Sequence, residues 1–188
     1  DLDLLVEHPV RIGRRRAQAD RQGLALEHQD SLVIRLEAVA EDIVRHYMGR
    51  YEAGSDQVGK AMVVSIDKAT AVRMYDLVQK HWAERLATLE AELKTTPELE
   101  RAPLAETIEF MRTTDMAVVV SQSQNEVADM AELGLDIAKH RKRINEEDLD
   151  SKFKDPADPF RLVFVCAMWL TGFDAPSCST VYLDKPMR

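Results

Sequence analysis

Cysteine, aromatic side chains and long apolar runs are all scarce in this sequence. Its two cysteines, Cys166 and Cys178, have no companions at metal-ligand spacing, and its five histidines are scattered. The cysteines are therefore expected to be reduced thiols, and the histidines to lie on surfaces and helix faces. No apolar run approaches the length of a membrane span, and Asp1–Asp3 does not start a signal peptide. These absences predict a soluble intracellular protein without a membrane partner.

Positive charge is also in short supply. The net charge is −8, which argues against a strongly basic nucleic-acid surface. Arg14–Arg16 and Lys139–Arg143 are basic exceptions, and the second is followed at once by the acidic residues Glu146–Asp148. Basic and acidic residues this close usually form solvated surface, which is the expectation for Lys139–Arg143. Arg14–Arg16 is expected to lie on the solvated face of a linker helix, with a DNA contact as the alternative. A role for Lys139–Arg143 in steering DNA stays open.

The motifs of a self-sufficient nucleotide enzyme are absent as well. No Gly-x-x-x-x-Gly-Lys-Ser/Thr loop occurs to cradle phosphates, and there is no acidic motif for magnesium. Phosphoryl transfer depends on such an electrostatic clamp around the phosphates. The chain alone is therefore expected to bind neither ATP nor Mg²⁺ and to be catalytically inactive.

Two regions differ in their apolar patterning. Residues 1–57 contain no buried-strand run, and Ser31–Tyr51 carries an apolar stripe at helical spacing. We expect residues 1–57 to be a helical connector from an upstream domain. From residue 58 to residue 188 apolar runs alternate with helical patterns, which predicts a parallel α/β sheet flanked by helices.

Four short apolar runs predict the strands of this sheet. They are Ala61–Ile66, Met116–Val120, Leu162–Val165 and Thr180–Leu183. Helices are predicted from Lys68 to about Leu93, over Pro103–Arg112 and over Glu126–Glu132. The polar stretch Lys139–Lys154 is expected to be a partly helical surface excursion.

Small and polar residues follow several of these strands. Ser65 ends the first, the polar loop Ser121–Asn125 follows the second, and Gly172 and Asp174 follow the third. Because ligands bind outside the carboxyl ends of parallel strands, these residues are candidates for a binding site. Gly, Ser, Asn and Asp are also ordinary turn residues, so a purely structural role stays open.

The amino-acid sequences of these segments resemble those of one protein family. Met168–Pro176 (MWLTGFDAP) and Val181–Met187 (VYLDKPM) are similar to helicase motif V and the next strand of type I restriction enzyme R subunits. Gly59–Ser65 (GKAMVVS) is similar to motif IV, Leu36–Tyr47 to the helix before it, and Phe153–Phe160 to the lead into motif V. The resemblance covers roughly three quarters of the chain, from about Ser31 onward. Those subunits use ATP to pull DNA past a bound complex.

The resemblance implies a fold and a set of site residues. The fold would be the second RecA-like lobe of a superfamily 2 helicase, partial because the chain stops before motif VI. Gly172 and Asp174 would line the ATP cleft, with the acid near the ribose. Ser65, Ser123 and Thr171 would contact DNA. Cys166 stands where many helicases carry a DNA-contacting Ser or Thr, and is expected instead to pack at the end of a strand.

The resemblance also implies what the parent protein does. The parent would be a type I site-specific deoxyribonuclease with ATP-dependent translocase activity, using ATP and Mg²⁺ in the cytoplasm of a bacterium or archaeon. Its partners would be double-stranded DNA and the modification and specificity subunits. The alternative is a degenerate RecA-like scaffold that serves as a subunit-interaction module.

Overall fold

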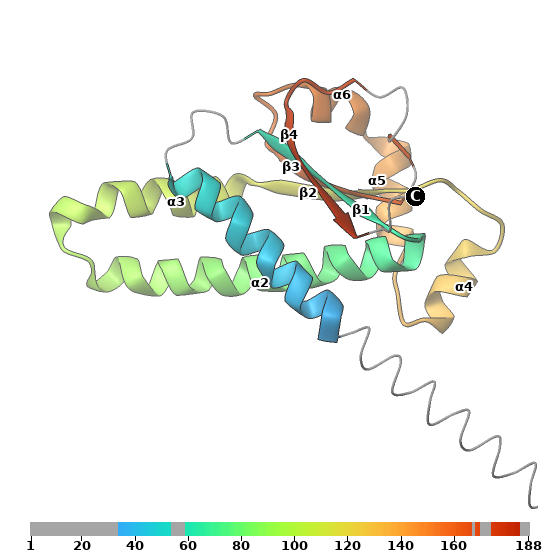
Figure 1. Cartoon of the computed structure of the whole chain (residues 1–188), viewed down its shortest axis with the longest axis horizontal. Coiled ribbons are helices and arrows are strands. Elements are labelled where there is room, and N and C mark those ends of the chain that lie inside the picture. Colours follow the sequence, from blue (N-terminus) through green and yellow to red (C-terminus); the bar gives the residue numbers. More distant parts are fainter. Residues whose placement is uncertain (1–33, 54–58, 167, 170–173, 185–188) are drawn as a thin grey trace, which may run out of the picture. The chain divides into compact units, whose positions relative to one another are not determined.

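A computed structural model of the chain describes residues 34–53, 59–166, 168–169 and 174–184. The chain divides into two compact units, Asp1–Ala38 and Val39–Arg188. Residues 34–52 are helical. The elements that follow (Figure 1) are β1 (Lys60–Ser65), α2 (Lys68–Thr95), the 3-10 helix η1 (Glu98–Glu100), α3 (Arg101–Thr113), β2 (Asp115–Val119), α4 (Glu126–Glu132), α5 (Ala138–Glu146), α6 (Leu149–Lys154), β3 (Phe160–Val165) and β4 (Cys178–Asp184).

The four strands form one parallel sheet in the order β2-β3-β1-β4. Every predicted strand is present, with its ends shifted by at most two residues. The predicted α/β class is therefore confirmed, and helices flank the parallel sheet as in a RecA-like lobe. Strands β1 and β3 occupy the middle, so their side chains are covered on both faces, which explains their unbroken apolar sequences.

Side chains alternate between the two faces of the sheet. On one face, Val163 and Val165 join a core cluster with Phe153 of α6. On the other face, Phe164 packs edge-on against Tyr75 of α2, with ring centroids 5.5 Å apart. The alternation follows from the two-residue period of a strand. Helix α6 thus covers one face and α2 the other.

Helix α2 packs against α3 and against the helix of residues 39–52. The indole Nε1 of Trp82 donates a hydrogen bond of 3.0 Å to the carbonyl of Met111 in α3. Tyr47 lies with its ring centroid 6.1 Å from that of Trp82. The buried positions Ala40, Ile43 and Tyr47 confirm the predicted apolar stripe of this helix. None of the helices in the described ranges has the length and apolarity of a membrane span.

The prediction that Lys139–Lys154 is partly helical is confirmed, but the prediction that it is only a surface excursion is wrong. This stretch forms α5 and α6, and His140, Leu149 and Phe153 are buried. The ring of His140 packs edge-on against Tyr75, with centroids 4.7 Å apart. The sequence looks polar because the charged residues of α5 bind other parts of the fold.

Arg143 shows how the charge of α5 is used. Its guanidinium donates to the carbonyl of Met116 at 2.9 Å, to Asp115 Oδ2 at 2.7 Å and to Glu147 Oε1 at 2.7 Å. Asp115 and Met116 belong to β2, which is an edge strand with no further strand beside it in the described sheet. The arginine therefore occupies a carbonyl of an exposed strand edge, a place where unwanted strand pairing would otherwise begin.

The amino ends of β1 and β4 meet closely. The backbone N–H of Lys60 donates to the carbonyl of Ser177 at 2.7 Å, and Lys60 Nζ donates to the carbonyl of Lys152 at 2.6 Å. Burial lowers the pKa of the Lys60 ammonium, and the carboxylates of Asp158 and Asp155 oppose that shift. A Cβ added at Gly59 would lie 2.6 Å from the carbonyl oxygen of Ser177.

We predict that Gly59→Ala destabilises the chain, because the obstructing atom is backbone and cannot rotate away. The loss in unfolding free energy should be about 1–3 kcal/mol, as for other overpacked sites. Gly49→Ala is the matched control, since nothing lies within 4 Å of its added Cβ. This helical position should gain up to about 1 kcal/mol. Urea unfolding of both variants checks the signs, and an unaffected Gly59→Ala would refute the close approach.

We also predict an acid-sensitive stability that originates at His140. Burial, with help from Lys139, lowers its pKa from 6.5 to about 4, and Asp76 opposes the shift. Because the pKa of His140 is lower in the folded chain than in the unfolded chain, acid favours unfolding. The contribution of His140 to the free energy of unfolding is complete above pH 6.5 and is lost as the pH falls toward 4. The loss should amount to as much as about 3 kcal/mol.

His140→Phe is the test, since it keeps a ring against Tyr75 and removes the titrating group. Urea unfolding at pH 7.5 and at mildly acidic pH measures the effect. The variant should lose less stability on acidification than the wild-type chain. Equal losses in both proteins would assign the acid sensitivity to other groups.

Candidate functional site

Three chain connections converge at the carboxyl edge of the sheet. Lys68, which opens α2 shortly after β1, donates from Nζ to Ser123 Oγ at 3.0 Å, and Ser123 follows β2. Between them, at the end of β3, Cys166 Sγ lies 4.0 Å from the carbonyl of Ile66. This is the edge at which parallel sheets bind ligands. Two of the predicted DNA-contacting residues, Ser65 and Ser123, belong to this edge.

Ser65 ends β1 as a fully buried residue. Its Oγ is buried too, and the described part of the chain offers it no hydrogen-bond partner. A buried hydroxyl without a partner costs about 1–3 kcal/mol relative to a satisfied one. Alanine would fill the same space without this cost, so packing alone does not account for a serine here.

The loop Ser121–Asn125 is exposed along its whole length. Asn125 adopts a left-handed conformation, with φ of 56°, where the loop enters α4. The backbone N–H of Ser123 donates to Glu126 Oε2 at 3.3 Å. The loop thus presents hydroxyl and amide side chains to solvent, while its backbone is tied to a carboxylate.

That carboxylate is paired with Arg141 of α5. Glu126 is 5% exposed, and Arg141 Nε donates to its Oε1 at 2.7 Å while a terminal nitrogen donates to its Oε2 at 3.0 Å. The same guanidinium donates to the carbonyls of Val120 and Ser121 at 2.9 and 3.3 Å. Arg141 therefore joins α5 to the end of β2 and to the start of α4.

Sequence reasoning missed Lys68, Glu126 and Arg141 as members of this edge. Lys68 and Glu126 each open a helix after a strand, a position that could have marked them. Arg141 gave no such signal, because it sits inside a basic run fifteen residues beyond Glu126. Only the fold brings the three together.

Asp174 lies in the connection that leads into β4. It is exposed and precedes the turn in which Cys178 N–H donates to the Ala175 carbonyl at 2.9 Å. Ser177 already contacts Lys60 at the amino end of β1. Three residues span at most about 11 Å, so Asp174 lies within that distance of Ser177. The structure therefore does not group Asp174 with Ser65 and Ser123, whereas the strand-end rule had placed it at the carboxyl edge.

Gly172 and Thr171, the other two candidates, lie outside the described residues. Trp169, just before them, has φ of 65° and packs against Phe153, with ring centroids 5.7 Å apart. Among the residues that the structure describes, no group of His, Cys, Asp and Glu side chains could hold a metal ion.

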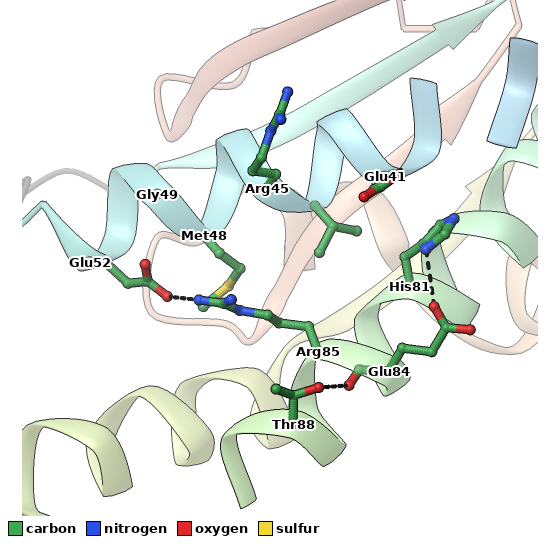
Figure 2. Close-up of a pocket in the computed structure, with 10 residues that line it drawn as sticks. Glu41, Arg45, Met48, Gly49, Glu52, His81, Glu84, Arg85 and Thr88 are labelled. Carbon is green, nitrogen blue, oxygen red and sulfur yellow. Dashed lines mark hydrogen bonds and ion pairs between the residues drawn. The ribbon is translucent and has the colours of Figure 1, made fainter. Parts of the chain in front are cut away.

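A pocket of about 400 Å³ lies elsewhere, between the helix of residues 39–52 and the middle of α2 (Figure 2). Figure 2 shows Arg85 reaching across it to Glu52, at 2.7 Å, and His81 Nδ1 facing Glu84 at 3.2 Å. His81 is about 20 Å along α2 from Lys68, given a rise of about 1.5 Å per residue. The pocket is therefore separate from the carboxyl edge, and its charges face one another.

The parallel sheet, its flanking helices and its polar carboxyl edge define the class of this chain as a RecA-like α/β lobe. The family described as "Type I restriction enzyme subunit R domain 3" matches residues 57–188. The chain belongs to this family of type I restriction enzyme R subunits.

Two curated relatives agree with that assignment. The HindI endonuclease subunit of a type I restriction enzyme from Haemophilus influenzae is 60% identical over 43 residues, which are 23% of this chain and 4% of the relative. A protein of Methanocaldococcus jannaschii, provisionally named as the MjaIXP endonuclease subunit, is 32% identical over 154 residues, 81% of this chain and 11% of the relative. The chain thus spans a small part of either relative. No solved structure is significantly similar to it.

We predict that Ser65→Ala raises the unfolding free energy of the chain by about 1 kcal/mol, because it removes a buried hydroxyl without a partner. Ser177→Ala is the control of opposite sign. Its Oγ donates to the Phe153 carbonyl at 2.9 Å, so that substitution should cost about 1 kcal/mol. Chemical unfolding of both variants measures the two changes in unfolding free energy. A destabilised Ser65→Ala would mean that the hydroxyl is satisfied within the fold.

Proposed function

We propose that this chain supplies the second RecA-like lobe of an ATP-dependent DNA-translocating motor in a type I restriction enzyme R subunit. Membership of the R subunit family supports the proposal, as does the all-parallel sheet that such a lobe requires. The translocase would act in a complex with modification and specificity subunits, and double-stranded DNA would be its track.

The observation that carries the proposal is the meeting of the β1 and β2 connections at the carboxyl edge. The hydrogen bond from Lys68 to Ser123 joins them there. Most side chains presented at this edge are hydroxyls and amides, which bind phosphate without formal charge. Such contacts suit a motor, because each one must form and break as the strand advances. The net charge of −8 agrees with weak DNA binding by this lobe alone.

Ser65 fits the same role. Its Oγ is buried and unpartnered at the end of the central strand, so a phosphate oxygen would reach it only if the edge opened as DNA bound. Ser123 is exposed and its hydroxyl already accepts from Lys68, which leaves its own proton free to donate. Thr171 is proposed as a third DNA contact on the strength of motif V.

Asp174 is proposed to face the nucleotide together with Gly172. Its carboxylate is exposed and offers two acceptor oxygens, which fits the hydroxyl pair of a ribose. ATP bound between this lobe and its partner lobe would supply the phosphoryl group whose hydrolysis drives movement. Mg²⁺ would be bound together with the phosphates of ATP in the parent protein.

The test uses the full-length R subunit assembled with its modification and specificity subunits. We expect Asp174→Ala to lower DNA-stimulated ATP hydrolysis at least tenfold, through loss of an aligned nucleotide contact. Ser65→Ala should lower it severalfold while leaving the protein as stable or more stable. Glu109→Ala, an exposed carboxylate on α3, is the control and should leave turnover unchanged.

Two outcomes would contradict this proposal. Turnover in Asp174→Ala equal to that of the Glu109→Ala control would remove the nucleotide role. A wild-type complex without any DNA-dependent ATP hydrolysis would remove the motor and favour the scaffold. In that case the paired helices α2 and α3 would be the part of the lobe to examine for subunit contacts.

A further inference from the structure

Two cations and one carboxylate meet beneath the Ser121–Asn125 loop. Arg141 binds Glu126 through both carboxylate oxygens, and Lys68 Nζ lies 3.7 Å from Glu126 Oε2. One negative charge therefore faces two positive ones. The cluster retains one positive charge at an edge whose neighbouring loop has none.

The two cations are not equivalent. Arg141 is 13% exposed, and its nitrogens are engaged with Glu126 and with the carbonyls of Val120 and Ser121. Lys68 is 21% exposed, and its ammonium has three donors, one of which goes to Ser123 Oγ. The available charge thus resides on Lys68, and Arg141 acts as a fixed part of the framework.

Lys68 and Ser123 together have the chemistry of a phosphate site. The ammonium lies 3.0 Å from the hydroxyl oxygen, so one phosphate group can accept from both. The hydroxyl supplies direction and the ammonium supplies charge. Glu126 fixes the position of both, because it accepts from the backbone of Ser123 and lies beside the ammonium.

We propose that Lys68 and Ser123 form a single phosphate-binding site for the DNA backbone, and that Glu126 and Arg141 are the positioning residues that hold it. This inference rests on the proposed function and deepens it. One lysine, Lys68, would then supply the electrostatic part of DNA binding by this lobe. The charges of Glu126 and Arg141 would serve to hold the site in place.

Salt dependence is the measurement that separates these roles. Each phosphate neutralised by a protein cation contributes about 0.9 to the slope of log affinity against log salt on duplex DNA. The DNA concentration that half-saturates ATP hydrolysis by the assembled complex is measured between about 50 and 200 mM salt. Lys68→Gln should make this slope shallower by about one contact, raise the half-saturating DNA concentration severalfold at the lower salt, and retain turnover at saturating DNA.

Three further variants sharpen the test. Lys68→Arg keeps the charge and should keep the wild-type slope. Glu126→Gln removes the negative charge and should make the slope steeper. Lys154→Gln is the control, because Lys154 is also a lysine in an ion pair, with Asp150 at 2.8 Å, but is more exposed and lies on α6. It should leave the slope and the half-saturating DNA concentration unchanged.

Arg141→Lys tests positioning. It keeps the charge and loses the two-pronged geometry, so the half-saturating DNA concentration should rise while the slope stays that of the wild type. Thermal unfolding of each variant verifies that the lobe is folded. A loss of folding alone would lower the amount of active complex and leave the half-saturating concentration and the slope unaltered.

The inference is overturned if Lys68→Gln matches Lys154→Gln in slope and half-saturation, with wild-type turnover still stimulated by DNA. That result would leave the proposed motor function standing. A wild-type complex with no DNA-stimulated turnover would overturn both the function and this inference.

Discussion

The carboxylate of Glu126 is buried, and the arrangement of the carboxyl edge depends on how its charge is balanced. A buried charge without a partner costs about 3–5 kcal/mol, so the fold must bring a cation to it. Arg141 meets that requirement, and its remaining nitrogens bind the carbonyls that lead out of β2. Strand β2, the polar loop, α4 and α5 are therefore held by one ion pair. The loop gains a defined shape from side chains, because no strand pairs with it.

Much of the fold was predictable from local sequence. Strands buried on both faces need continuous apolar runs, and Leu162–Val165 is such a run. Helix α4 has the predicted limits, Glu126–Glu132, since Gly134 marks its end with φ of 70°. The carboxyl-edge position of Ser65 and Ser123 followed from the strand order along the chain. Each of these predictions depended on a few neighbouring residues.

What escaped prediction depends on partners that are distant in sequence. The run Lys139–Arg143 was expected to be solvated, yet Arg143 binds β2 and His140 packs on Tyr75 of α2. Composition cannot distinguish a charged surface from a charged helix whose partners lie elsewhere. The position of Asp174 escaped for a related reason: the strand-end rule says where a connection begins, whereas Asp174 sits close in sequence to where the next strand starts.

The central position of β1 has a consequence for how the protein is made. Ala61 pairs with Leu162 on one side and with Thr180 on the other, so β1 lacks its first neighbour until the ribosome has reached Leu162 and its second until it has reached Thr180. Contacts this distant in sequence slow folding, because a long loop must close before they form. During synthesis, the apolar side chains of β1 are therefore not yet flanked by β3 and β4. Helices α2 and α3, whose contacts are local, can pair during that time.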